Sequence, residues 1–167
     1  IDFGTDPSNW IAAARADEVD MLYETVGDFL DVMDGIGWIN SEAVTANTIV
    51  VRPNALAEVD GKKPYADARV RRALQMAVDN SVCLELGYSG LGTVAANHHV
   101  CSIHPEYADI GPAKFEPAGA KALMEEAGML DYEHELMSID DDWRKNTTDA
   151  VAAQLRDAGF KVKRTIL

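Results

Sequence analysis

KPYADARVRRALQMAVD, residues Lys63 to Asp79, is the stretch that decides the fold. Pro64 disfavours helix at Lys63 and fixes its own φ. Asp67 can accept hydrogen bonds from the free N–H groups of the following turn, so we expect a helix N-cap there. Beyond it, apolar residues recur on one helical face and arginines take the other, namely Val70, Ala73, Leu74, Ala77 and Val78 against Arg69, Arg71 and Arg72. The stretch predicts a tight turn followed by an amphipathic helix that ends at Asp79.

Outward from this stretch, helical and strand patterns alternate along the chain. We expect helices over 7–17, 25–33, 80–87, 116–127 and 143–158, and strands over 18–23, 46–52, 133–139 and 161–167. Residues 88–112 are rich in Gly, His and Pro without a sustained period, which predicts a structured loop. The alternation predicts one α/β domain over residues 1–167, with a mixed, mostly parallel sheet flanked by helices.

Composition narrows the classes of partner. The formal net charge is −13, which disfavours binding to nucleic acid or to an anionic membrane surface. No apolar run approaches the length needed to span a bilayer, so we expect no membrane insertion. Ile1 opens without a signal peptide and Leu167 lies in a strand-like run. We therefore expect this chain to be a piece of a longer protein.

The central stretch also resembles a known sequence signature. PYADARVRRAL, residues Pro64 to Leu74, resembles the Pro-Phe/Tyr-x-Asp-x-Arg-Val-Arg-x-Ala-Leu signature of the large solute-binding proteins that feed ABC importers, extracellular solute-binding protein family 5. KFEPAGAKALMEEAGM, from Lys114 to Met129, is similar to that family's Tyr-Asp-Pro-x-x-Ala-x-x-Leu-Leu-x-Glu-Ala-Gly helix. Further stretches resemble the family in the same order, namely 13–23, 48–54, 87–105 and 150–167. Asp17 stands where Gly is usual, and Pro53 replaces an aromatic residue ahead of an extra loop, 55–61.

The resemblance implies a fold and a role. It implies a periplasmic-binding-protein-like (type II) lobe, here a truncated piece of the second large lobe. The implied function is the substrate-binding component of an ABC importer, which captures peptides or related small solutes by hinge closure and delivers them to permease subunits in the inner membrane. It implies no enzyme and no cofactor, and a periplasmic or lipid-anchored parent protein.

Candidate ligand contacts follow from the rule that α/β sheets bind ligands beyond the carboxyl ends of strands, at helix N-termini. That rule and the resemblance point to three places: the exit of the first predicted strand, the loop 90–99 and the start of the last helix. The candidates are Tyr23, Glu24, Thr25, Gly92, Asn97, His98, Asp142 and Trp143. Each has a structural alternative: Thr25 can cap a helix, the glycines can serve tight turns, and the aspartates at 140–142 can offset the helix dipole.

A different class of function rests on HHVCSIH, residues 98–104. His98, His99, Cys101 and His104 suggest a metal-dependent or cysteine hydrolase, although zinc sites usually add a second pair of ligands elsewhere. Because no such pair occurs, we expect no metal site. A receptor-like domain that binds only a protein partner is a further alternative. Cys83 and Cys101 could form a disulfide in an exported protein, while Cys83 on a helix is also typical of a buried free thiol.

Overall fold

The computed structural model describes residues 6–23 and 27–167, which divide into two compact units, 1–44 and 45–167. In the first unit, α1 (Pro7–Arg15) begins as predicted: the Asp6 carboxylate accepts from the Ser8 N–H at 2.9 Å, and Pro7 opens the helix. Helix α2 (Asp28–Gly35) begins after Gly27, later than the predicted 25–33, and Thr25 lies outside the described residues.

The predicted strand at 18–23 is wrong. Asp17 has a left-handed φ of 53°, and the residues that follow form no ladder. Met21 and Tyr23 are 78% and 79% exposed, so the alternating pattern has no covered face to bury.

The second unit contains the α/β structure. After the 3-10 turn η1 (Pro64–Ala66) come α3 (Ala68–Met76), α4 (Asn80–Tyr88) and α5 (Pro117–Glu126), followed by β1 (Glu133–Ser138), α6 (Asp142–Asp157) and β2 (Lys161–Ile166). Asp67 caps α3 as predicted, accepting from the Arg69 N–H at 2.8 Å. Helix α3 ends at Met76 rather than Asp79, because the Asp79 carboxylate caps α4 instead.

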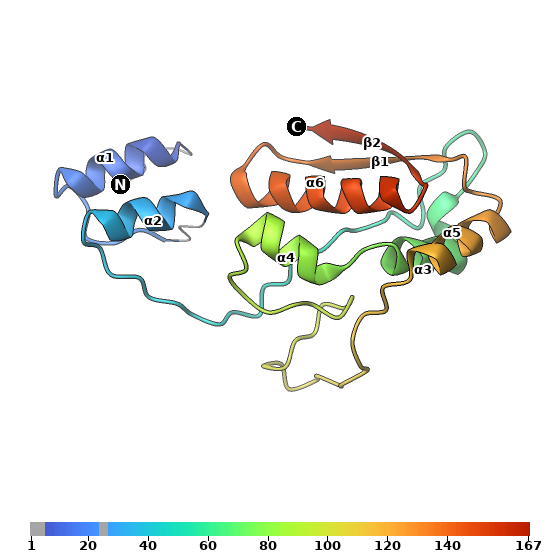
Figure 1. Ribbon diagram of the computed structural model, residues 1–167, viewed down its shortest axis with the longest axis horizontal. Coiled ribbons are helices and arrows are strands. Elements are labelled where there is room, and N and C mark those ends of the chain that lie inside the picture. Colours follow the sequence, from blue (N-terminus) through green and yellow to red (C-terminus); the bar gives the residue numbers. More distant parts are fainter. Residues whose placement is uncertain (1–5, 24–26) are drawn as a thin grey trace. The chain divides into compact units, whose positions relative to one another are not determined.

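Strands β1 and β2 pair in parallel, in register from Glu133 with Lys161 to Ser138 with Ile166. Helix α6 connects the two strands and contacts both, and α4 packs on α6 (Figure 1). The structure confirms the predicted strands and the helix between them in this part of the chain. Two parallel strands require a crossover connection, which α6 supplies. The fold class is accordingly an α/β lobe; that all 167 residues form one domain stays a prediction.

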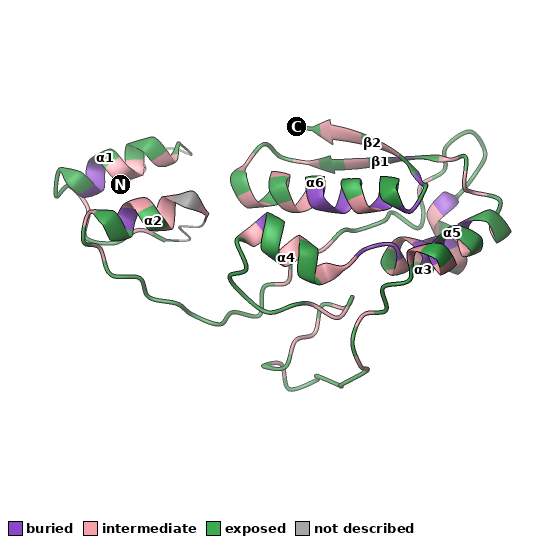
Figure 2. Ribbon diagram, viewed as in Figure 1, coloured by how far each residue is buried: buried purple, intermediate pink, exposed green. Residues whose placement is uncertain are grey.

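The core of the second unit contains buried residues of α3, α5 and α6. Figure 2 shows buried segments along α6 and between α3 and α4. Val70, Ala73, Ala120 and Met124 have no exposed surface. Small side chains on α3 and α5 allow these two helices to approach closely, while Leu155 and Phe160 join the same core from the end of α6 and the turn after it.

The predicted strand at 46–52 is also wrong. ANTIVVR runs without a ladder, and Ile49 and Val51 are 43% and 54% exposed. β-Branched residues favour extended backbone, but a strand requires a hydrogen-bonded neighbour. Separately, no helix within the described residues combines the length and apolar composition needed to cross a membrane.

Candidate functional site

The start of α6 carries two of the predicted ligand contacts, and local contacts explain much of its sequence. Asp141 caps the helix by accepting from the Arg144 N–H at 3.0 Å, and its carboxylate also pairs with the Arg144 guanidinium. Asp140 pairs with Lys145 at 3.0 Å, and Asp142 accepts from the Asn146 amide at 2.9 Å. These carboxylates therefore stabilise the first turns of α6, as the structural alternative predicted.

Trp143 lies where α6 meets the end of α4. Its indole meets Tyr88 edge to face with ring centroids 6.0 Å apart, and the Arg144 guanidinium carbon lies 4.0 Å from its ring centroid. The indole is half-buried, so part of its surface remains available to a solute. The contact with Tyr88 fixes one end of the antiparallel α4–α6 pair, whose close approach is set by Gly87 against Thr147.

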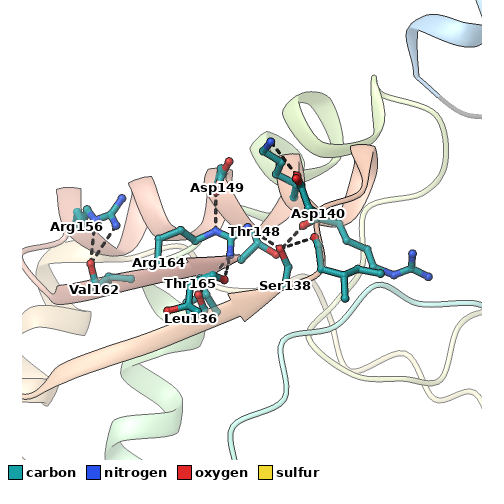
Figure 3. Close-up of polar contacts among 12 residues, drawn as sticks. Leu136, Ser138, Asp140, Thr148, Asp149, Arg156, Val162, Arg164 and Thr165 are labelled. Carbon is teal, nitrogen blue, oxygen red and sulfur yellow. Dashed lines mark hydrogen bonds and ion pairs between the residues drawn. The ribbon is translucent and has the colours of Figure 1, made fainter. Parts of the chain in front are cut away.

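The carboxyl end of the sheet holds a guanidinium that the sequence analysis did not single out. The Arg164 side chain, 12% exposed, reaches from β2 toward α6 (Figure 3). Its Nε donates to Asp149 at 2.6 Å, and its Nη2 donates to the Ser138 hydroxyl at 2.6 Å. The sequence pattern could have revealed Arg164. It lies between Val162 and Ile166 on the sheet face turned toward α6, where an apolar residue is expected.

A second arginine in Figure 3 contacts the backbone of β2. Arg156, in the last turn of α6, donates from Nε and Nη2 to the Val162 carbonyl at 3.3 and 3.0 Å. Leu167 exchanges backbone hydrogen bonds with Ser138 and Asp140. In a parallel pair this pattern alternates, so the backbone N–H and C=O groups of odd-numbered β2 residues point toward β1, and those of even-numbered residues point away from it. The Val162 carbonyl therefore lies on the outer edge of β2, and Arg156 covers it.

The loop after α4 carries the other three predicted contacts of the second unit. Asn97 has a left-handed φ of 62°, which asparagine tolerates, and its Oδ1 accepts from the Asn80 amide at 2.9 Å. Gly92 has a φ of 135°, a conformation that side chains rarely adopt. The His98 ring faces Tyr107 at 6.2 Å between centroids.

The structure thus does not gather the candidate residues of the second unit at one point. Asn97 contacts Asn80, the first residue of α4, whereas Trp143 contacts Tyr88, the last. Tyr23 belongs to the first unit and is exposed, and Glu24 and Thr25 lie outside the described residues.

In the HHVCSIH segment, Cys101 and His104 contact each other. The His104 Nδ1 accepts from the Cys101 N–H at 3.0 Å and lies 3.3 Å from the Cys101 Sγ. Across residues 6–23 and 27–167, no group of three or more His, Cys, Asp or Glu side chains could hold a metal ion. Both thiols are free, and the Cys83 thiol, whose pKa is raised by burial, accepts from the Gln154 amide at 3.3 Å. The described residues therefore supply no metal-ligand group of this size for the metal-dependent form of the hydrolase alternative.

The one histidine outside this segment, His134, is buried at the start of β1. Its Nδ1 lies 3.2 Å from the Tyr65 hydroxyl, and its Nε2 is enclosed without a hydrogen-bond partner. Burial lowers the pKa of His134 to about 4 and raises that of Tyr65 to about 12. Tyr65 belongs to the PYAD turn, so this contact ties the turn to the sheet.

A model of the family described as bacterial extracellular solute-binding proteins, family 5 Middle, matches residues 1–166. Among curated relatives, the chain is 37% identical over 67 residues to heme-binding protein A of Haemophilus influenzae, which covers 40% of this chain and 12% of that protein. It is 35% identical over 68 residues to the dipeptide-binding protein of Escherichia coli, covering 41% and 13%. The chain thus spans only about an eighth of the length of these relatives.

Solved structures show the same similarity. The PBP AgaA from A. tumefaciens R10, in complex with agropinic acid, matches 62% of this chain and 22% of its own, with a TM-score of 0.56 and 27% identity. The dipeptide-binding protein from Pseudoalteromonas sp. SM9913, in complex with Met-Leu, matches 64% and 22%, with a TM-score of 0.55 and 21% identity. The second of these likenesses supports the fold alone.

Proposed function

Because this chain belongs to the bacterial extracellular solute-binding proteins of family 5, we propose that it is part of the substrate-binding component of an ABC importer. The observation that carries the proposal is the family match over residues 1–166, together with the parallel β1–α6–β2 unit in the matching lobe. The family is one of binding proteins rather than enzymes. In this role the parent protein captures peptides or related small solutes by hinge closure, and no bond is made or broken.

The proposed partners and location follow from the same role. The closed, loaded form would dock on permease subunits in the inner membrane, and the parent would work in the periplasm or on a lipid anchor at the outer face of the cell membrane. Relatives described above bind a dipeptide or agropinic acid, and one is named for heme, so the proposed cargo is a small organic solute of this range.

The predicted contact residues remain our proposal for the ligand surface, namely Tyr23, Glu24, Thr25, Gly92, Asn97, His98, Asp142 and Trp143. Trp143 is the best supported of these, because its half-buried indole lies at the N-terminus of α6, beyond the carboxyl end of β1. An indole in such a place can stack on an apolar or cationic solute.

The test is native mass spectrometry of the intact parent protein, purified gently from its own cells. We expect a stoichiometric organic passenger that leaves on unfolding and that identifies the cargo class. An empty parent carrying one zinc ion would contradict the proposal and favour the hydrolase alternative.

A paired variant tests the role of Trp143 in the same experiment. Trp143→Leu in the parent should reduce passenger occupancy, whereas Trp38→Leu, a half-buried tryptophan of the first unit, should leave it unchanged. Equal occupancy in both variants would remove Trp143 from the ligand surface.

A further inference from the structure

A cavity of about 220 Å³ opens beside the start of α4. Three segments from different parts of the second unit line it: the α3–α4 junction, the loop after α4, and the approach to α5. All of the lining residues except Asp79 and Asn80 are apolar, and the full set is Val78, Asp79, Asn80, Val94, Ala95, Ala96, Pro112, Ala113 and Phe115. Apolar walls with a few polar groups are typical of a small-molecule site.

The two polar side chains in the lining make the cavity attractive to a donor and unattractive to an anion. The Asp79 Oδ1 accepts from the Ser81 hydroxyl at 2.6 Å and from the Ser81 N–H at 2.9 Å. These bonds lower the pKa of Asp79, so its carboxylate stays ionised at neutral pH. They also occupy donors that an anion at this helix N-terminus would need.

Asn80 points to the same chemistry. Its Nδ2 donates to the Ala95 carbonyl at 2.6 Å and to the Asn97 Oδ1 at 2.9 Å, so both of its amide hydrogens are engaged. The side chain therefore has only its oxygen left to offer a solute. With no basic residue in the lining, the cavity presents one negative charge and acceptor groups.

The position of Asp79 is fixed from α6. The Gln154 Oε1 accepts from the Asp79 N–H at 2.8 Å, and the Gln154 Nε2 donates to the Asp79 carbonyl at 3.3 Å. A side-chain amide thus pairs with both backbone groups of Asp79, as a neighbouring strand would. The Asp79 backbone is therefore fixed by Gln154 and its carboxylate by Ser81 before any ligand arrives, which lowers the entropic cost of binding.

We propose that this cavity binds a small primary amine, with the ammonium group on Asp79 and the apolar body against Val78, Val94 and Phe115. The volume lies below the range of about 300–1,000 Å³ usual for drug-sized ligands, so the occupant is a small solute or one side chain of a larger one. The net charge of −13 complements a cation and speeds its approach. That such an amine is cargo rests on the proposed solute-binding function; that the cavity binds it does not.

The experiment titrates the 167-residue chain with benzylammonium and, separately, with uncharged benzyl alcohol, following backbone amide shifts by NMR. We expect saturable shifts confined to residues 78–80, 94–96 and 112–115 with benzylammonium, and binding of benzyl alcohol at least fivefold weaker. Asp79→Asn should weaken benzylammonium binding at least fivefold, because asparagine keeps the helix cap and removes the charge. Asp6→Asn, the same change at the cap of α1, should have no effect.

A second variant tests the walls: Ala95→Leu should fill the cavity and abolish binding of both probes while leaving the remaining amide spectrum dispersed. Absence of localised shifts, equal binding of both probes, or an unchanged affinity in Asp79→Asn would each overturn the inference. An organic passenger on the parent without amine binding here would contradict this inference alone. Amine binding here with an empty, zinc-loaded parent would contradict only the proposed function.

Discussion

At the scale of single residues, Gly87 fixes how closely α4 approaches α6. A Cβ at this position would lie 2.1 Å from the Thr147 Oγ1 and 2.7 Å from the Thr147 Cα, and the second of these is backbone. We expect Gly87→Ala to lower the free energy of unfolding by about 1–3 kcal/mol, because the overlap outweighs the better helix propensity of alanine. Chemical denaturation measures the change.

The matched control is Gly35→Ala at the end of α2, where no atom lies within 4 Å of the added carbon. This variant should be neutral or slightly more stable. If both variants had the same stability as the unchanged chain, α4 and α6 would not be in the close contact described.

His134 makes stability depend on pH. The unfolded chain binds a proton on this side chain near its ordinary pKa of 6.5, while the folded chain does so only near 4. The unfolded state therefore binds more protons between these values, and the free energy of unfolding falls as pH is lowered from about 6.5 to about 4. The loss from this one group is at most about 3 kcal/mol.

His134→Phe should remove that part of the pH dependence, measured as the difference in unfolding free energy between pH 7 and pH 4. The comparison is with the unchanged chain, so carboxylates that titrate in both cancel. The same pH dependence in His134→Phe as in the unchanged chain would refute the assignment.

At the scale of elements, Arg164 connects β2 to α6 and to the end of β1. Arg164→Met should lower the free energy of unfolding by about 1–3 kcal/mol, since it removes charged hydrogen bonds to Asp149 and Ser138. Lys163→Met is the control on the same strand: Lys163 pairs with Glu135 at 2.9 Å on the exposed face, and exposed pairs contribute less than about 1 kcal/mol. Thermal unfolding of both variants checks the prediction, and equal losses would contradict it.

Some elements were predicted correctly from the sequence and others were not. Asp67 was predicted as a cap, and the aspartates at 140–142 as favourable charges at a helix start, because these roles depend on a few neighbouring residues. The segments 18–23 and 46–52 were wrongly predicted as strands because strand formation depends on a distant partner, which composition does not reveal. The β1–α6–β2 unit succeeded because both of its strands are close in the chain and share one covering helix.

The candidate site was predicted less well for a similar reason. Trp143 and Asn97 were proposed as contacts from their places at a helix start and in a glycine-rich loop, but only the packing of α4 shows that they contact its opposite ends. The cavity beside Asp79 joins three segments separated by loops, and no local pattern marks it.

At the scale of the whole molecule, residues 46–52 form an exposed connection that lacks a ladder. We expect trypsin to cut after Lys62, in the exposed loop that follows this connection, before it cuts after Arg71 or Arg72 in α3. Backbone outside regular structure fits a protease active site without unfolding, whereas the Arg52–Pro53 bond is not a trypsin site. Mass spectrometry of the early digest should show a product of residues 63–167, which retains every helix and strand from η1 to β2.

Lys62→Gln should delay this cut while leaving the later ones in α3 unchanged. An initial cut within α3 would instead show that the signature helix opens more readily than this loop. The expected product offers a direct route to the second unit for calorimetry.

The guanidinium of Arg156 over the Val162 carbonyl bears on self-association. An uncovered strand edge is a template on which another chain can lengthen the sheet, and charged side chains are one means of blocking it. On β2 an incoming strand would have to displace Arg156 before it could bond to Val162, whereas no such guanidinium is recorded on the outer edge of β1 among the described residues. Fibril-like stacking of partly unfolded copies would therefore add new strands at the free edge of β1. A charged residue in place of the exposed Met137 on β1 should therefore reduce aggregation.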